Sequence, residues 1–164
     1  MIANILTFIH IACSLIAIGA GGKVLFGLLA GKLVEKWTVI FFRCSLAASV
    51  AGLLFSFHHL SFTQWLAMVS VYVSGAAILG WRKFHLVGIW RSICAFSTTI
   101  VLCLNILLLT TQAFEHIPVL KALAPTLSEP TFLASQLLES TFFVVLGVVA
   151  VRRFRDSRVD SFGR

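Results

Sequence analysis

The stretch Leu53–Phe62, with the sequence LLFSFHHLSF, joins two long apolar runs with almost no polar spacer between them. The sequence has no Lys or Arg between Arg43, which precedes this stretch, and Arg82, which follows it. Loops on the cytoplasmic side of a membrane carry an excess of Lys and Arg, whereas loops on the other side do not. The stretch therefore predicts a membrane hairpin whose tip, at His58 and His59, faces away from the cytoplasm.

The composition is that of a membrane protein. Hydrophobic residues make up 59% of the 164 and charged residues 12%, with a mean hydropathy of +1.00, whereas soluble domains carry about 25% charged residues. Such a chain can bury its surface in a lipid bilayer, where closed hydrogen-bonded structures such as helices are stable. The length predicts one compact bundle without a separate soluble domain. The net charge of +7 does not indicate nucleic-acid binding, because the basic residues stand at the ends of the apolar runs.

Five apolar runs are long enough to cross a bilayer, which takes about 20 residues. The first run is too long for the core of a signal peptide and has no basic residues before it, so we expect it to be a helix of the mature protein. The predicted spans are residues 5–29, 39–57, 62–81, 92–112 and 131–151. The sequence therefore predicts an all-α, polytopic, five-helix transmembrane bundle.

The connections between the spans predict the orientation. All basic residues but one lie in or next to the first connection, in the third connection, or in the tail 152–164, and the exception is Lys121 in the connection 113–130. The positive-inside rule then places the N-terminus outside and the C-terminus in the cytoplasm. The middle of 113–130, IPVLKALAPTL, is apolar but short, which predicts a helix on the membrane surface. We expect the basic tail to contact the cytoplasmic headgroups and otherwise to be mobile.

Small and polar residues recur at alternating three- and four-residue spacing in every predicted span. Helices in lipid pack through such faces, and this spacing keeps the residues on one side of a helix. The predicted inner faces are Ala3, Thr7, His10, Ser14, Ala17 and Gly21; Ser45, Ala48, Gly52, Ser56 and His59; Ala67, Ser70, Ser74 and Ala77; Thr98, Asn105 and Gln112; and Gln136, Glu139 or Ser140, Phe143 and Gly147.

Four of these polar residues are predicted at similar depth. At about 1.5 Å per residue from the outer ends of the spans, His10, Ser70, Asn105 and Glu139 reach one layer. An ionisable group inside a membrane is costly and faces the interior with a partner. We predict that His10 and Glu139 pair, directly or through water, with Asn105 and Ser70 beside them. The layer is either a polar cluster that fixes helix register or a site for a ligand, quinone, proton or metal.

The histidines also raise the question of a haem. A b-type haem in a helical bundle is commonly held by two histidines at similar depth on facing helices. His10 is the only histidine predicted well inside the bundle, whereas His58 and His59 lie near the outer surface and His85 lies on the cytoplasmic side. The spacing therefore argues against bis-histidine ligation within one protomer.

A second possibility is an outer-surface metal site formed by His58, His59 and His116, with Glu115 nearby. Imidazole suits copper or zinc, but adjacent histidines point in different directions on a helix, and such residues more often form a polar cap at the interface. No hydrolase, phosphate-loop or zinc-protease motif is present in the sequence. The sequence thus favours a protein that is not an enzyme.

Two phrases carry a family resemblance, FIHIACSLIAIGAGG at residues 8–22 and GAAILGWRKF at residues 75–84. With the basic connection between them, they resemble a family of small bacterial multi-spanning inner-membrane proteins of unknown function. Its first helix opens with a histidine followed by small residues, matched here by His10, and its third ends in a Gly-Trp-basic phrase, matched by residues 80–82. The resemblance covers roughly residues 1–90 and implies a bacterial inner membrane. The first connection, GKLVEKWT, lacks the histidine expected there, which weakens a metal or haem role for it.

Three functions are open. Short loops, the lack of a strong motif and the many small-residue faces favour an accessory or structural subunit of a larger membrane complex, such as a respiratory or photosynthetic one. A self-contained haem-, quinone- or metal-binding protein would use the layer of His10 and Glu139. A small transporter or channel is the weakest of the three, because five spans do not give the symmetric halves of an inverted repeat.

Overall fold

The computed structural model describes residues 2–54 and 62–156, and within these ranges every regular element is a helix. The side chains described are those of residues 10–53 and 64–155. The helices are α1 (Ile2–Leu29), α2 (Glu35–Leu54), α3 (Phe62–Arg82), α4 (Ile89–His116), α5 (Pro118–Leu123) and α6 (Pro130–Asp156). The all-α prediction is confirmed.

Five of these helices, α1, α2, α3, α4 and α6, are long and apolar enough to cross a membrane. The chain is therefore an integral, multi-span membrane protein, and its bilayer contact follows from the same helices. The predicted spans match these five, and α5 is the short helix expected between the fourth and fifth.

Helices α1, α2 and α4 begin three or four residues earlier than predicted, and two helices extend well past their predicted C-terminal ends. Helix α4 continues to His116 instead of ending near residue 112, because Pro118 is the first residue that cannot continue it. Helix α6 continues to Asp156 instead of 151. Arginine is a good helix former and is favoured near the negative end of the helix dipole, so the basic residues prolong the helix. The segment 152–156 is thus ordered helix.

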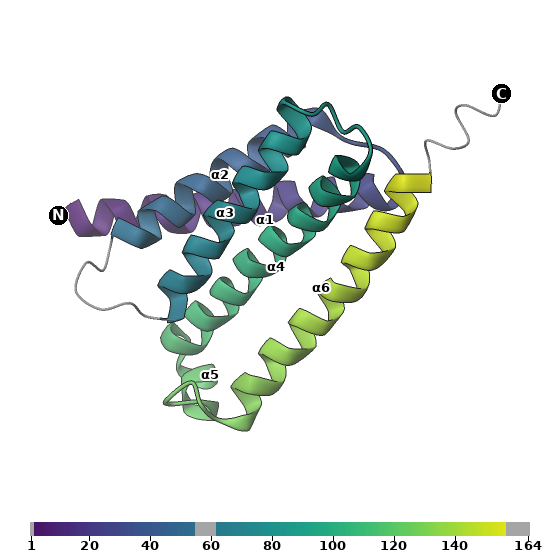
Figure 1. The fold of residues 1–164 in the computed structure, drawn as a ribbon. Coiled ribbons are helices and arrows are strands. Elements are labelled where there is room, and N and C mark those ends of the chain that lie inside the picture. Colours follow the sequence, from purple (N-terminus) through teal and green to yellow (C-terminus); the bar gives the residue numbers. More distant parts are fainter. Residues whose placement is uncertain (1, 55–61, 157–164) are drawn as a thin grey trace.

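Helix α4 occupies the middle of the bundle, where it packs against α1, α3, α5 and α6 (Figure 1). Helices α1 and α2 form a second closely packed pair, and α3 packs against α2 as well as α4. Helix α6 lies at the side of the bundle along α4, with a smaller contact to α1. One helix therefore organises the fold, and α6 is its most peripheral span.

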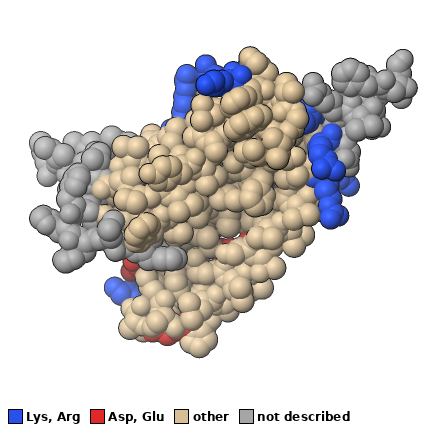
Figure 2. All heavy atoms as spheres, in the orientation of Figure 1, with Lys and Arg blue, Asp and Glu red and all other residues tan. Residues whose placement is uncertain are grey.

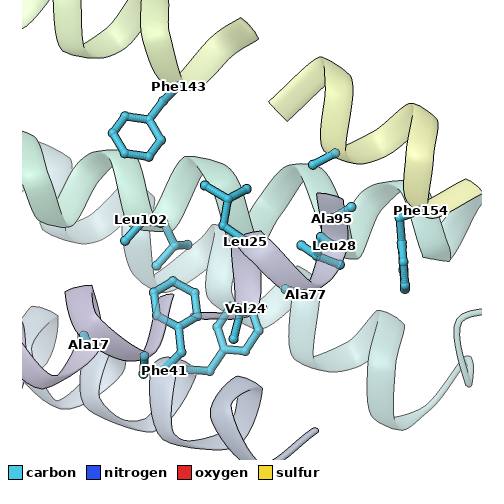
Figure 3. Close-up of a cluster of buried hydrophobic side chains, with 14 residues drawn as sticks. Ala17, Val24, Leu25, Leu28, Phe41, Ala77, Ala95, Leu102, Phe143 and Phe154 are labelled. Atoms are coloured by element: carbon cyan, nitrogen blue, oxygen red, sulfur yellow. The ribbon is translucent and has the colours of Figure 1, made fainter. Parts of the chain in front are cut away.

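The hydrophobic core joins α1, α2, α4 and α6, with a single contribution from α3 (Figure 3). Phe41 and Phe42 are almost fully buried, and their ring centroids lie 5.0 Å apart. A Cβ added at Gly21 would lie 2.7 Å from Cε2 of Phe41 and 2.8 Å from Cδ1 of Leu102, so this glycine lets three helices approach closely. Because lipid is as apolar as these side chains, close packing is what holds the helices together.

The predicted inner faces are largely confirmed. All four predicted residues of α3 are buried, as are Ser45 and Ala48 of α2 and Thr98 and Asn105 of α4. Gln112 was predicted inside but is exposed, because the buried side of α4 changes there to Thr111 and Phe114, against which α5 and the start of α6 pack. The side chains predicted at residues 3, 7, 56 and 59 lie outside the described residues.

Basic side chains gather at the end of the bundle that holds the α3–α4 connection and the C-terminus of α6 (Figure 2). Lys121, on α5, stands at the opposite end. The basic residues of the connections are thus grouped at one end of the bundle, and Lys121 lies at the other end, as the sequence predicts. That this end faces the cytoplasm, as the positive-inside rule predicts for the end with the grouped basic residues, stays a prediction.

Candidate functional sites

His10, on α1, contacts α2. Its Nδ1 lies 2.9 Å from the backbone oxygen of Ala48, so Nδ1 carries the proton and donates it to the carbonyl. The ring also lies over Gly52, where an added Cβ would be 3.5 Å from Cε1. Gly52 therefore leaves room for the imidazole, and His10 belongs to the interface between α1 and α2.

Asn105, on α4, contacts α2 as well. Its Nδ2 donates to Oγ of Ser45 at 3.1 Å and to the backbone oxygen of Val101 at 2.8 Å. The side chain is buried. Because a buried amide that keeps its hydrogen bonds orients its neighbours, Asn105 fixes the register of α4 against α2.

Glu139, on α6, contacts α4 instead. Its Oε1 accepts a hydrogen bond from Oγ1 of Thr110 at 2.6 Å. Its Oε2 is buried without a hydrogen-bond partner, and so is Nε2 of Gln136, one turn earlier on the same helix. The interface between α4 and α6 thus holds a partly satisfied polar cluster of Thr110, Gln136 and Glu139.

The four residues predicted as one layer therefore lie in different helix interfaces. Glu139 bonds to Thr110, His10 to Ala48 and Asn105 to Ser45, and no hydrogen bond joins His10 to Glu139 among the described residues. Ser70 is buried on α3, where the neighbouring Ser74 keeps a buried hydroxyl oxygen without a partner. A ligand or cofactor at these residues stays a prediction.

The structure does not test the predicted outer metal site, which stays a prediction. His58 and His59 lie outside the described residues. His116 is exposed, and its Nδ1 lies 3.0 Å from the backbone oxygen of Gln112. Within residues 10–53 and 64–155, no three His, Cys, Asp or Glu side chains are grouped so that they could hold a metal ion.

The outer face of α3 was not singled out from the sequence. Tyr72 is the central residue of this 21-residue helix and is 79% exposed. Trp65, Val69 and Leu79 are exposed on the same side. A Cβ added at Gly75, next to Tyr72 on this face, would meet nothing within 4 Å. The signal in the sequence was a single tyrosine in the middle of an apolar span, three and four residues before a glycine and an alanine.

Comparison of the chain with protein-family models, with curated proteins and with solved structures gives no match. The class of the protein therefore rests on its five long apolar helices, which make it a multi-span integral membrane protein.

Proposed function

We propose that the protein is an accessory subunit of a larger membrane complex, and that it docks to its partner through the outer face of α3. This face consists of Trp65, Val69, Tyr72, Gly75 and Leu79. The same proposal places the protein in a bacterial inner membrane, with its basic end in the cytoplasm, and makes the larger complex an electron-transfer complex.

Tyr72 is the observation that carries the proposal. Its position puts it about 15 Å from either end of α3, which is the middle of the hydrocarbon layer. Tyrosine favours the two membrane–water interfaces, where its hydroxyl meets water or headgroups. In hydrocarbon, a hydroxyl without a hydrogen-bond partner costs about 1–3 kcal/mol on mutational scales. A partner helix with a hydrogen-bond acceptor removes that cost.

The surroundings of Tyr72 fit a helix better than lipid. Membrane helices associate through small residues that let the backbones approach. Gly75 provides such an opening, because nothing of this chain fills the space of its missing Cβ. Trp65, near the outer end of α3, adds a large exposed surface on the same side. Together they form a shallow surface with one polar group at its centre.

Native electrophoresis of membranes solubilised in a mild detergent tests the proposal. We expect the wild type to migrate in an assembly larger than the protein alone, and Gly75→Leu to release it by blocking close approach. Tyr72→Phe, which removes only the hydroxyl, should weaken the assembly. Gly19→Leu is the matched control, because Gly19 is also an outward-facing glycine of a span with nothing within 4 Å. Equal behaviour of Gly75→Leu and Gly19→Leu would reject the docking face.

A second candidate function is a self-contained quinone-, haem- or metal-binding protein. One observation favours the quinone form, namely the two partnerless polar atoms of Gln136 and Glu139 at the interface between α4 and α6. A quinone carbonyl accepts hydrogen bonds of the kind that an amide N–H donates. Solvent extraction of the purified protein for quinone, with an absorption spectrum for haem, tests this candidate. Loss of a bound quinone in Gln136→Leu, but not in His10→Ala, would support it.

A further inference from the structure

A groove lies between α4 and the C-terminal end of α6, separate from the polar clusters above. It has a volume of about 320 Å³ and is lined by Phe96 of α4 and by Val148, Val151, Arg152 and Arg155 of α6. The four α6 residues stand at positions i, i+3, i+4 and i+7, which lie on one side of a helix. The groove is therefore built by a stripe of α6 and one aromatic side chain of α4.

The polarity of the groove changes along its length. Val148 and Val151 come first along α6, next to Phe96, and Arg152 and Arg155 follow toward the end of the helix. From Val148 to Arg155 the helix rises about 10 Å. An apolar section is thus followed by a basic one, at the end of the bundle where the basic side chains gather (Figure 2). A phospholipid has the same order of polarity, from acyl chain to phosphate.

Contacts between α4 and α6 hold the basic end of the groove in place. Arg91, at the start of α4, has its guanidinium carbon 3.9 Å from the ring centroid of Phe154, and its Nε donates to the backbone oxygen of Phe154. Phe154 is itself buried. These contacts fasten the last turns of α6 to α4, so Arg152 and Arg155 are carried by a helix that is held in place.

We propose that this groove binds one anionic phospholipid, with an acyl chain along Phe96, Val148 and Val151 and the phosphate at Arg152 and Arg155. Charge complementarity selects the occupant, because two guanidinium groups favour a headgroup of net negative charge over a zwitterionic one. Arginine also presents a fork of donors that fits phosphate oxygens in pairs. Basic pockets between membrane helices on the cytoplasmic side recognise lipids by this chemistry.

Native mass spectrometry of the delipidated protein tests the proposal. The protein in mild detergent is titrated with phosphatidylglycerol or with phosphatidylcholine of the same acyl chains. We expect one phosphatidylglycerol to bind preferentially, and Arg152→Gln or Arg155→Gln to weaken it about fivefold each, as expected for one basic residue near the headgroups. Arg153→Gln is the matched control, since Arg153 has the same charge and is exposed but does not line the groove. If Arg152→Gln and Arg153→Gln lose the same affinity for phosphatidylglycerol, the lipid is attracted by the overall positive charge and not by the groove, and the proposal is wrong.

A filling substitution tests the apolar half of the groove. Val148→Trp changes no charge but occupies the space beside Phe96, so it should lower phosphatidylglycerol binding while leaving the helix content by circular dichroism unchanged. If phosphatidylglycerol binds Val148→Trp as tightly as the wild type, the acyl chain does not lie in the groove and the proposal is wrong.

Discussion

Helices α4 and α6 are both long and apolar, yet they have different roles in the bundle. In the α4 span 56% of the residues are buried, whereas in the α6 span 17% of the residues are buried. Helix α4 packs against α1, α3, α5 and α6 and also hydrogen-bonds to α2, whereas α6 contacts mainly α4 (Figure 1). Helix α2 is less hydropathic than α6, yet more of its residues are buried. In this protein, hydropathy therefore decides which segments enter the membrane but does not decide how many of their residues are buried.

The polar side chains of the two helices differ in the same way. On α4, the hydroxyls of Thr98, Thr99 and Thr111 donate to carbonyls one turn earlier, and Asn105 uses its amide to reach α2. On α6, Glu139 and Gln136 each keep a buried atom without a partner. The polar groups of α4 therefore serve packing, whereas those of α6 leave hydrogen-bonding capacity for a further component.

The largest effect is expected where α1 and α2 crowd against α4. Gly21→Val would force side-chain atoms against Phe41 and Leu102, and overpacking of this kind costs about 1–3 kcal/mol. Gly19→Val serves as the control because an added Cβ there meets nothing within 4 Å. The free energy of unfolding, measured in mixed detergent micelles, should fall for Gly21→Val and stay near that of the wild type for Gly19→Val. Equal stability of the two variants would contradict the close packing of the three helices.

A smaller loss is expected at the amide of α4. Asn105→Leu removes the hydrogen bond to Ser45, and interhelical hydrogen bonds in membranes contribute about 0.6 kcal/mol on average and up to about 1.7. Thr98→Val removes a bond within α4 alone and should cost less in the same unfolding measurement. If Thr98→Val were the more destabilising of the two, Asn105 would not fix the register of α4.

At the interface between α4 and α6, we expect the loss of one hydrogen-bonding partner to destabilise the protein and the loss of both partners to have little effect. Thr110→Val alone leaves Glu139 without its one hydrogen bond and should destabilise the protein by about 1 kcal/mol. The double variant Thr110→Val with Glu139→Leu removes both partners and should be close to neutral, because replacing both members of a buried polar pair restores an apolar contact. A double variant less stable than Thr110→Val would show that the carboxylate serves packing after all.

The smallest effect concerns the start of α6. Partial desolvation tends to raise the pKa of Glu129, but hydrogen bonds from the backbone N–H groups of Glu129, Thr126 and Ser128 and from the hydroxyl of Thr126 outweigh it and lower the pKa. A lowered pKa stabilises the folded loop above the ordinary range for glutamate, and this contribution is lost as the pH falls through the folded-state value. The protection of the amides at residues 131–134 against hydrogen exchange, after correction for the intrinsic rate at each pH, should therefore fall on acidification in the wild type. In Glu129→Gln it should show no such dependence on pH.

Much of the fold could be predicted from the sequence, because each span is an apolar run with at most one charged residue and because small residues at helical spacing mark the sides that pack. The inner face of α3, with Ser70 and Ser74, is an example. The partners of the polar residues could not be predicted, since depth alone does not tell which helices are neighbours. His10 and Glu139 were predicted at one depth, but α1 and α6 use these residues against α2 and α4.

The groove at the end of α6 could not be predicted from the sequence, for a different reason. A run such as RRFRD after an apolar span is typical of a mobile basic tail. Only the contacts of Phe154 with Arg91 show that this run is part of the bundle. Contacts between segments so far apart in the chain leave no mark in a local pattern.

The docking role of α3 can be tested most directly by photocrosslinking in native membranes. A benzophenone amino acid replaces Tyr72 in one variant and Val144 in another. Both residues are exposed near the middle of a span, but Val144 lies on α6. We expect one discrete adduct with a different membrane protein from position 72, abolished by Gly75→Leu, and no protein adduct from position 144. No adduct from position 72, or one that contains only a second copy of this chain, would contradict the proposed role as an accessory subunit.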